Sequence, residues 1–429
     1  MTNKVLYGPQ TKAALENFPF DYHKTLREFI YAIVIIKKAA AAANFQAGKL
    51  TKERSSKIIA ACDEILKGKY NDQFVVSAHH GGAGTSPHMN VNEVVGSLSG
   101  THPNDHVNAS QSTNDVNPSA LRIASVKLTR KLLKSLDHLI SVFDEKSHEF
   151  RSIQKLGRTH FQDAVPTTLG AGFASYRDIL KRDKKRIEEA LIYLYELNLG
   201  ATAIGNSINA PKEYIVNVYK ELRQITGINE LKPLENLMSG TSSDADFCHI
   251  SGAVTILCND LSKIALDLRF MSSGPRGGIG EISFKELQPG SSIMPGKVNP
   301  IMAETINQTY YLISGKNLSI HQAAEGAHME LGVMLPIIAD SLITMLKIVD
   351  TALNIFTDRG IKMIIANKER CKELLERSTA YATLLTPRLG YDVVSKVVKE
   401  SVSTGKTIRE VILEKKLLSA VELEKLLVI

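Results

Sequence analysis

The sequence predicts a protein dominated by α-helices, in which a central bundle of long helices joins smaller helical domains at the N-terminal and C-terminal ends. From Ser119 to Phe150, leucines and other apolar residues recur mostly at spacings of three and four, which is the apolar stripe of an amphipathic helix. Strand signals are few and short, near Val5–Tyr7 and Phe74–Val76. Several helical segments exceed the usual globular length, which is typical of a bundle or of an oligomer core.

The helical segments predict three domains, over residues 1–117, 118–362 and 363–429. A polar, glycine-rich stretch ends the first, mainly helical domain and carries loops suited to an active site. In the central domain the apolar spacing predicts long helices over residues 119–150, 167–198, 245–270, 303–314 and 330–356. In the small C-terminal domain it predicts short helices over residues 367–376, 392–401, 407–414 and 419–427.

The bulk composition argues against several classes of protein. Aromatic residues make up 6% of the chain and tryptophan is absent, which disfavours a stacking surface for nucleic acid. The net charge of +7 is mild for 429 residues and would help to steer an anionic substrate. The N-terminus lacks the apolar core of a signal peptide, and no apolar run is long enough to span a bilayer. The four cysteines lack CxxC spacing and fit a reducing compartment, so we expect a cytoplasmic protein with no membrane or nucleic-acid partner.

Four polar loops between the helical segments are too elaborate to be plain connectors; they cover residues 81–93, 104–115, 157–163 and 290–300. In the last loop, small residues that let the backbone close on a ligand precede Lys297. Asn117–Pro118 and Asn299–Pro300 look like an N-cap followed by a first-turn proline, and such helix starts attract anions. Two of them suit a ligand with two carboxylates, although two ordinary capped helices would show the same pattern.

Neither a metal nor a cofactor is expected. Five histidines gather in one stretch without His-Glu-x-x-His or a comparable ligand spacing: His79, His80, His88, His102 and His106. No glycine pattern follows a strand to suggest a nucleotide fold. Ser291 near Lys297 could suggest a nucleophilic hydrolase, but the chain has neither a GxSxG elbow nor Ser-x-x-Lys spacing at these residues.

The run Gly290–Pro300 resembles the signature loop of the aspartase/fumarase superfamily over its whole length. The other three loops match in the same order, as do Ala201–Tyr214 and the helical tail, so the resemblance covers essentially the entire chain. It implies the fold of that superfamily and a cofactor-free elimination from a small dicarboxylate. Together with the long helices, it also implies a homotetramer whose active sites each draw loops from three subunits.

The resemblance assigns roles to individual residues. Ser291 matches the catalytic base that removes the proton beside one carboxylate, and the closing loop must then stabilise its alkoxide. Lys297 matches a group that binds a substrate carboxylate, and His160 matches a group oriented by Glu304. The implied substrate-binding residues are Thr85, Ser86, Ser112, Thr113, Asn114, Thr159, Ser292, Met294 and Asn299. The implied secondary anion site comprises His102, Asn104 and Asp105.

Aspartases and fumarases differ in the leaving group, which is ammonia or water. Thr85 in Gly-Ala-Gly-Thr-Ser and Ser112–Thr113 in Gln-Ser-Thr-Asn-Asp resemble the aspartase versions, which implies loss of ammonia from L-aspartate to give fumarate. His102–Asn108 looks fumarase-like, so fumarate hydration stays an alternative, as does a non-catalytic paralogue. Pro87–His88 departs from the superfamily pattern, which generally carries Asn at the second position, and leaves another succinyl-type substrate open.

Overall fold

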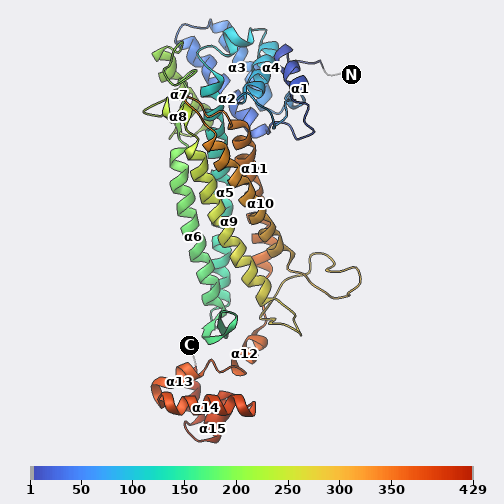
Figure 1. The fold of residues 1–429 in the computed structure, drawn as a ribbon, viewed down its shortest axis with the longest axis vertical. Helices are drawn as coiled ribbons and strands as arrows, with labels where there is room; N and C mark the ends of the chain where they lie inside the picture. The colour runs from blue at the N-terminus through green and yellow to red at the C-terminus, as the bar shows by residue number, and fades with distance from the viewer. Residues whose placement is uncertain (1–3, 428–429) are drawn as a thin grey trace. The chain divides into compact units, whose positions relative to one another are not determined.

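The protein is built mainly from α-helices, and its few strands are short (Figure 1). The structure is a computed structural model that describes residues 4–427. The chain divides into two compact units: the first holds residues up to 134 with Asp183–Cys258 and Thr309–Thr351, and the second holds Ser135–Arg182, Asn259–Gln308 and the residues from 352 on. The predicted helical fold class is confirmed, whereas the division into three domains stays a prediction. No helix within residues 4–427 is long and apolar enough to cross a membrane.

The five long helices overlap the segments whose apolar spacing predicts them. They are α5 (Thr113–Glu149), α6 (Leu169–Tyr193), α9 (Ala245–Met271), α10 (Ile301–Glu325) and α11 (Leu335–Ile355). Helix α10 continues well beyond its predicted end at residue 314, where polar residues interrupt the apolar stripe. One of them, Asn317, accepts a hydrogen bond from Ser251 Oγ on α9 at 2.8 Å. A tertiary contact therefore supports the helix where the sequence pattern ends.

The prediction that Asn117–Pro118 opens a helix is wrong, because α5 already begins at Thr113. Ser112 takes the capping role: its Oγ accepts from Asn114 N at 3.3 Å and its own N–H donates to the Asp115 carboxylate at 2.9 Å. Pro118 lies inside the helix and has no N–H for the carbonyl of Asn114. The Asn198 amide donates to that carbonyl instead, at 3.1 Å.

In the first unit, α2 packs between α3 and α7 and also contacts α4 (Figure 1). The helices and short turns of this unit, besides the long helices, are α1 (Pro9–Asn17), α2 (Arg27–Gln46), α3 (Lys52–Leu66), η1 (Asn71–Gln73), α4 (Thr85–Ser99), η2 (Pro103–Val107), α7 (Lys212–Thr226) and α8 (Ser239–Ser242). Strands β3 (Glu196–Leu197) and β4 (Lys232–Pro233) form a short parallel pair. The strands expected at Val5–Tyr7 and Phe74–Val76 do not form; next to the second, Ser77 makes a single isolated bridge to Lys24.

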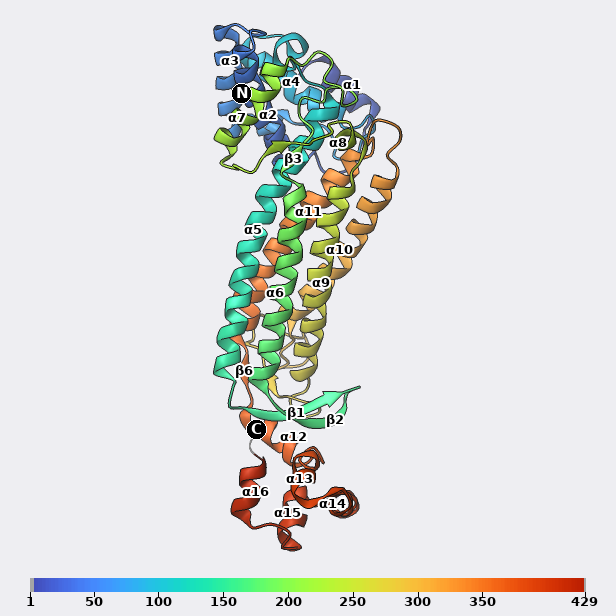
Figure 2. The same cartoon turned by 90° about the vertical axis from the view of Figure 1, so that its left-hand side faces the viewer.

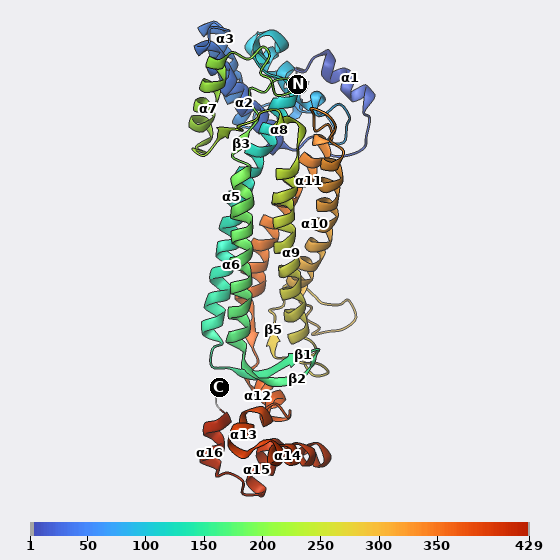
Figure 3. The same cartoon turned by 60° about the vertical axis from the view of Figure 1, so that its left-hand side comes forward.

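In the second unit, β1 (Gln154–Thr159) and β2 (Gln162–Thr168) form an antiparallel hairpin (Figures 2 and 3). The sequence predicted only a loop there, because Gly157 and Pro166 break the alternation that marks a strand. Strands β5 (Ile282–Ser283) and β6 (Ile365–Ala366) also pair antiparallel. Two short turns, η3 (Phe356–Gly360) and η4 (Ile361–Met363), precede β6.

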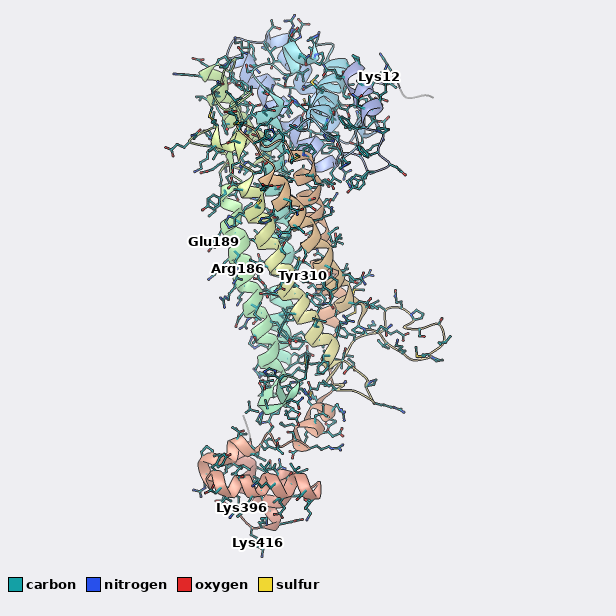
Figure 4. The ribbon with its side chains drawn as sticks, in the orientation of Figure 1. Lys12, Arg186, Glu189, Tyr310, Lys396 and Lys416 are labelled. Carbon is teal, nitrogen blue, oxygen red and sulfur yellow. The ribbon has the colours of Figure 1, made fainter. Side chains whose placement is uncertain are left out.

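The C-terminal residues of the second unit form a cluster of short helices. These are α12 (Lys368–Glu376), α13 (Ala382–Leu389), α14 (Tyr391–Thr404), α15 (Ile408–Glu414) and α16 (Ala420–Leu427). Leu385, Val397 and Val411 are among the buried residues of their common apolar core. Lys396 and Lys416 lie on the outer side of these helices and are exposed (Figure 4). All the short helices predicted from the tail are present, and α13, which contains a proline, was missed.

Candidate active site

The starts of α4 and α5 lie against each other in the first unit and carry the predicted leaving-group residues. Asn117 Nδ2 on α5 donates to the Gly84 carbonyl at 2.9 Å, directly before α4. Gly84 has φ +83°, and a Cβ there would lie 2.4 Å from Asn117 Nδ2, so only glycine permits this approach. The contact brings Thr85–Ser86, at the start of α4, to the side of Ser112–Asn114, at the start of α5.

Thr113 is joined to two buried basic side chains. Its Oγ1 lies 2.8 Å from His88 Nδ1, and His88 Nε2 lies 2.7 Å from Lys37 Nζ. Lys37 is 0% exposed and also donates to Asn108 Oδ1 at 2.8 Å and to Gln111 Oε1 at 3.0 Å. Burial lowers the pKa of Lys37 to about 7. Burial, with the charge of Lys37 beside it, lowers the pKa of His88 well below its ordinary value. His88 is therefore neutral.

Asp115 is the buried acid of this cluster. Its carboxylate accepts backbone N–H groups from Ser112 at 2.9 Å, Gly200 at 3.0 Å and Thr202 at 3.1 Å, which ties the start of α5 to the segment after β3. Burial raises the pKa of Asp115 to about 6, against the opposing effect of these donors and of Lys37. The backbone around Thr113 is thus held by a carboxyl group that titrates near pH 6.

We expect Asp115 to make the free energy of unfolding fall as pH rises from about 4 to about 6. Its pKa is near 3.9 in an unfolded chain and about 6 in the folded one. The folded state therefore keeps a proton that the unfolded state has lost, and this stabilisation is complete below the unfolded pKa and lost through the folded pKa. Urea unfolding of the wild type and Asp115→Asn, at one protein concentration across this range, measures it.

The stability difference between wild type and Asp115→Asn should shrink with rising pH and become constant above about pH 6. Asp21 is exposed in the same unit, so Asp21→Asn is the matched control for removing one carboxylate. A pH-independent difference for Asp115→Asn would contradict the prediction.

The residues implied as a secondary anion site lie on or beside η2. Asp105 N donates to His102 Nδ1 at 3.1 Å, and His102 N donates to His106 Nδ1 at 3.0 Å. The side chains of His102 and Asp105 are 53% and 74% exposed, so they are open to a ligand. Asn104 lines a cavity of about 470 Å³ together with Ser112, which links this loop to the start of α5.

In the second unit, the hairpin presents Thr159 and His160 at its tip. Thr159 pairs with Gln162, and His160 and Phe161 between them have φ of +54° and +60°, as a tight two-residue hairpin turn requires. Phe161 packs on Phe270 with ring centroids 4.6 Å apart. Thr159 and His160 are both exposed, so their polar groups are open to a ligand.

A buried carboxylate fixes the base of this hairpin. Glu281 is 0% exposed, and its Oε1 accepts from Arg158 Nη1 at 2.8 Å. Lys155 Nζ lies 3.1 Å from Oε2, an ion pair without the angles of a hydrogen bond. The Glu281 carbonyl accepts from Asn367 N at 2.9 Å. Glu281 therefore joins the hairpin to the chain that leads into the signature loop.

The signature loop is closed at its base and open at its tip, and it leads into α10 (Figure 1). Asn299 Nδ2 donates to the Gly290 carbonyl at 2.8 Å, and α10 begins at Ile301, two residues after Asn299. A Cβ at Gly290 would lie 2.0 Å from the Lys297 carbonyl, so this closure also requires glycine. Ser291 Oγ accepts from Ile293 N at 3.2 Å. Three other loop residues with implied roles are exposed: Ser292, Met294 and Lys297.

Within the described chain, Glu304 does not orient His160. Glu304 lies on the first turn of α10, and its Oε1 accepts from Gln308 Nε2 at 3.1 Å. No hydrogen bond joins it to His160 within residues 4–427, so that pairing stays a prediction. Among these residues there is also no group of three or more histidine, cysteine, aspartate or glutamate side chains that could hold a metal ion.

Sequence reasoning missed Lys37, Asp115 and Glu281 as parts of the site. Lys37 did leave a signal, because it ends the apolar run Phe29–Ile36 inside a helix whose other face is also buried. His88 was noticed as a departure from the superfamily pattern, but its two partners lie 51 and 25 residues away in the sequence. Local spacing cannot reveal such pairs.

Comparison with known families identifies the class of protein that this fold and these loops define. The chain matches the family model described as Lyase over residues 1–315 and the model described as Fumarase C C-terminus over residues 382–429. It therefore belongs to this lyase family, the aspartase/fumarase superfamily.

Several individual proteins are similar to this chain in sequence or in structure. The chain is 44% identical over 435 residues to an aspartate ammonia-lyase of Bacillus subtilis (strain 168), covering 99% of this chain and 91% of that protein. It is 42% identical over 436 residues to the aspartate ammonia-lyase of Escherichia coli (strain K12), covering 97% and 90%. Its structure superposes with a TM-score of 0.94 on a fumarate lyase:delta crystallin from Brucella melitensis bound to cobalt, at 39% identity over 99% of this chain and 95% of that one. The TM-score is also 0.94 for the recombinant class II fumarase from Schistosoma mansoni, at 31% identity and the same coverage.

Proposed function

We propose that this protein eliminates ammonia from L-aspartate to give fumarate. The observation that carries the proposal is the near full-length similarity to aspartate ammonia-lyases, at 44% identity over 99% of the chain. The geometry agrees with it, because Thr85 and Thr113 lie on two helix starts joined by the Asn117–Gly84 hydrogen bond. Hydroxyl oxygens in this arrangement can accept hydrogen bonds from an α-ammonium group.

In the proposed reaction, Ser291 acts as the base. Its alkoxide takes the proton from the carbon next to one carboxylate, the electron pair of that C–H bond forms the double bond, and the C–N bond breaks with its pair left on nitrogen. The Ile293 N–H already donates to Ser291 Oγ and is one donor for the alkoxide. Lys297 and His160 hold the substrate carboxylates, and no metal or cofactor takes part.

One assay separates the proposed activity from its alternatives. Fumarate absorbs in the ultraviolet, so its appearance from L-aspartate, from L-malate or from neither can be followed directly. Formation from L-aspartate supports the proposal, and formation from L-malate alone would mean a fumarase, which the His102–Asn108 loop favours. Formation from neither, with a folded protein, would mean a non-catalytic paralogue.

We also propose a cytoplasmic homotetramer whose active sites combine loops from different subunits. Four large apolar side chains of the first unit lie exposed on α9 and α10: Ile256, Tyr311, Leu312 and Leu318. Burial of such side chains between subunits is favourable. The implied site residues of the second unit, Ser291 and Lys297, lie on an open loop, as expected of a site completed by other chains.

Sedimentation at micromolar concentration should therefore show a tetramer. Replacing Tyr311 and Leu318 together with serine should shift the protein toward smaller species and reduce activity in parallel, because the sites need several subunits. Lys396→Ser, on the outer side of the C-terminal helices, is the control and should leave both unchanged. A fully active monomer would rule out the proposed assembly.

A further inference from the structure

Lys37, His88 and Thr113 form a continuous hydrogen-bonded row, and the proposed mechanism does not use Lys37 or His88. The distances are 2.7 Å from Lys37 Nζ to His88 Nε2 and 2.8 Å from His88 Nδ1 to Thr113 Oγ1. Lys37 and His88 are 0% and 1% exposed, so neither can touch a substrate. His88 has two hydrogen-bonded partners, Lys37 and Thr113, and of these only Thr113 is an implied substrate-binding residue, so His88 acts on the reaction through Thr113.

In each hydrogen bond of this row, the donor and the acceptor can be assigned. A protonated lysine has three N–H donors and no acceptor, and Lys37 Nζ has three acceptors around it: His88 Nε2, Asn108 Oδ1 and Gln111 Oε1. His88 Nε2 must therefore accept, so the proton of this neutral imidazole is on Nδ1. Nδ1–H then donates to Thr113 Oγ1, and the hydroxyl hydrogen of Thr113 is turned toward some other acceptor.

We infer that Lys37 and His88 are positioning residues that make Thr113 a hydrogen-bond donor to the departing ammonia. The inference rests on the proposed function. The α-ammonium of the substrate has no lone pair, so it cannot accept a hydrogen bond from the Thr113 hydroxyl. When the C–N bond breaks, the bonding pair becomes the lone pair of neutral ammonia, and the Thr113 O–H donates to it. This interaction exists only late in the reaction, so it raises kcat more than it lowers KM.

His88 can be replaced in two ways that separate this role from simple packing. In His88→Asn the amide oxygen can accept from Lys37 while the amide N–H donates to Thr113, so the direction of the row is kept. In His88→Leu the volume is nearly kept but both hydrogen bonds are lost. Steady-state kinetics with L-aspartate should show kcat about tenfold lower for His88→Leu, with KM changed less than about twofold, and most of kcat retained by His88→Asn.

A double-mutant cycle tests whether His88 acts through Thr113. Because the Thr113 hydroxyl is the end of the row, His88→Leu should cost nothing further in a Thr113→Ala background. Independent losses that multiply in the double variant would overturn the inference, as would a His88→Leu effect confined to KM. If His88→Leu does not give folded protein, Lys37→Met breaks the row at its other end. Because Lys37 also donates to Asn108 and Gln111, its loss should shrink in a Thr113→Ala background without vanishing, and a loss of unchanged size there would overturn the inference.

The pH dependence gives a readout that packing alone would not move. Above the pKa of Lys37, about 7, its amine has only two N–H groups and gains a lone pair, so His88 is no longer held in one tautomer. The titratable groups that interact with Lys37 are Cys62 on α3 and Asp115 on α5, and Asp115 in turn interacts with Tyr214 and Tyr219 on α7. His106 lies on η2, two residues before Asn108. The pKa of Asp115 is about 6, and burial raises the pKa values of Cys62 and both tyrosines, so these four ionise outside the range just above 7. Burial lowers the pKa of His106, so it has already lost its proton there.

The kcat ratio of wild type to His88→Leu should therefore shrink as pH rises through about 7. A ratio that is constant with pH would contradict the inference. This failure is distinct from failure of the proposed function, which would appear as a wild-type protein that forms no fumarate from L-aspartate at any pH.

Discussion

Ser291→Ala is expected to lower kcat by about 10² to 10⁴, the usual worth of a general base, with little change in Tm or in the tetramer. The fold does not depend on this hydroxyl, because it lies on the open signature loop and its Oγ accepts only from Ile293 N among the described residues. Fumarate should still bind, since Lys297 and His160 are untouched. Stopped assays of turnover, with calorimetric titration of fumarate, measure the two effects separately.

Ser292→Ala is the matched control for this experiment. Ser292 is the neighbouring hydroxyl on the same loop and is exposed, whereas Ser291 is half-buried, so loss of Ser292 should reproduce any effect on loop flexibility. If Ser292 only positions the substrate, its replacement should be milder than that of Ser291. Retention of more than about a tenth of kcat by Ser291→Ala, well short of a general base's worth, would place the base elsewhere. His160 acting through a water molecule would then be the first candidate.

The long helices could be predicted from the sequence because their stabilising contacts are periodic. Leu121, Leu132 and Leu139 on α5 are each 0% exposed, as the stripe predicts. The hairpin β1–β2 could not be predicted, because its strands are fixed by the buried Glu281 with Arg158 and Lys155 rather than by alternation. The spacing of apolar residues predicts which face of one element is buried, but it does not predict polar contacts between elements.

The residues of the candidate site differ in the same way, since some belong to a local sequence motif and others meet only through contacts between elements. Ser291 and Lys297 could be proposed from sequence because they stand within one short motif. Lys37, His88 and Thr113 come from three helices, and only the packing of α2 and α4 against the start of α5 brings them into a row. Charged side chains usually stay in contact with water, and the buried Lys37 is an exception to this rule. Such exceptions are expected at functional sites, and a prediction based on the rule misses them.

Lys297→Ala is expected to weaken both binding and turnover. Its ammonium makes no ion pair within residues 4–427 and is exposed on the signature loop, so it is available for a substrate carboxylate. That carboxylate is charged in the ground state and gains further negative charge as the proton leaves, so the lysine contributes at both stages. Loss of a hydrogen bond to a charged group predicts kcat/KM lower by about ten- to a hundredfold, with KM raised as well as kcat lowered.

The control for Lys297 is Lys285, another exposed lysine that lies shortly before the loop and outside the signature run. Lys285→Ala removes the same charge from the surface and should leave kcat and KM nearly unchanged, which separates direct contact from general electrostatic steering. Raising the ionic strength should likewise weaken steering in the wild type and in Lys285→Ala alike. An unchanged KM in Lys297→Ala would mean that another cation holds the ground-state carboxylate. Tm should stay unchanged in Lys297→Ala, because an exposed lysine without an ion pair contributes little to the free energy of unfolding. A lower Tm would mean that this charge stabilises the fold.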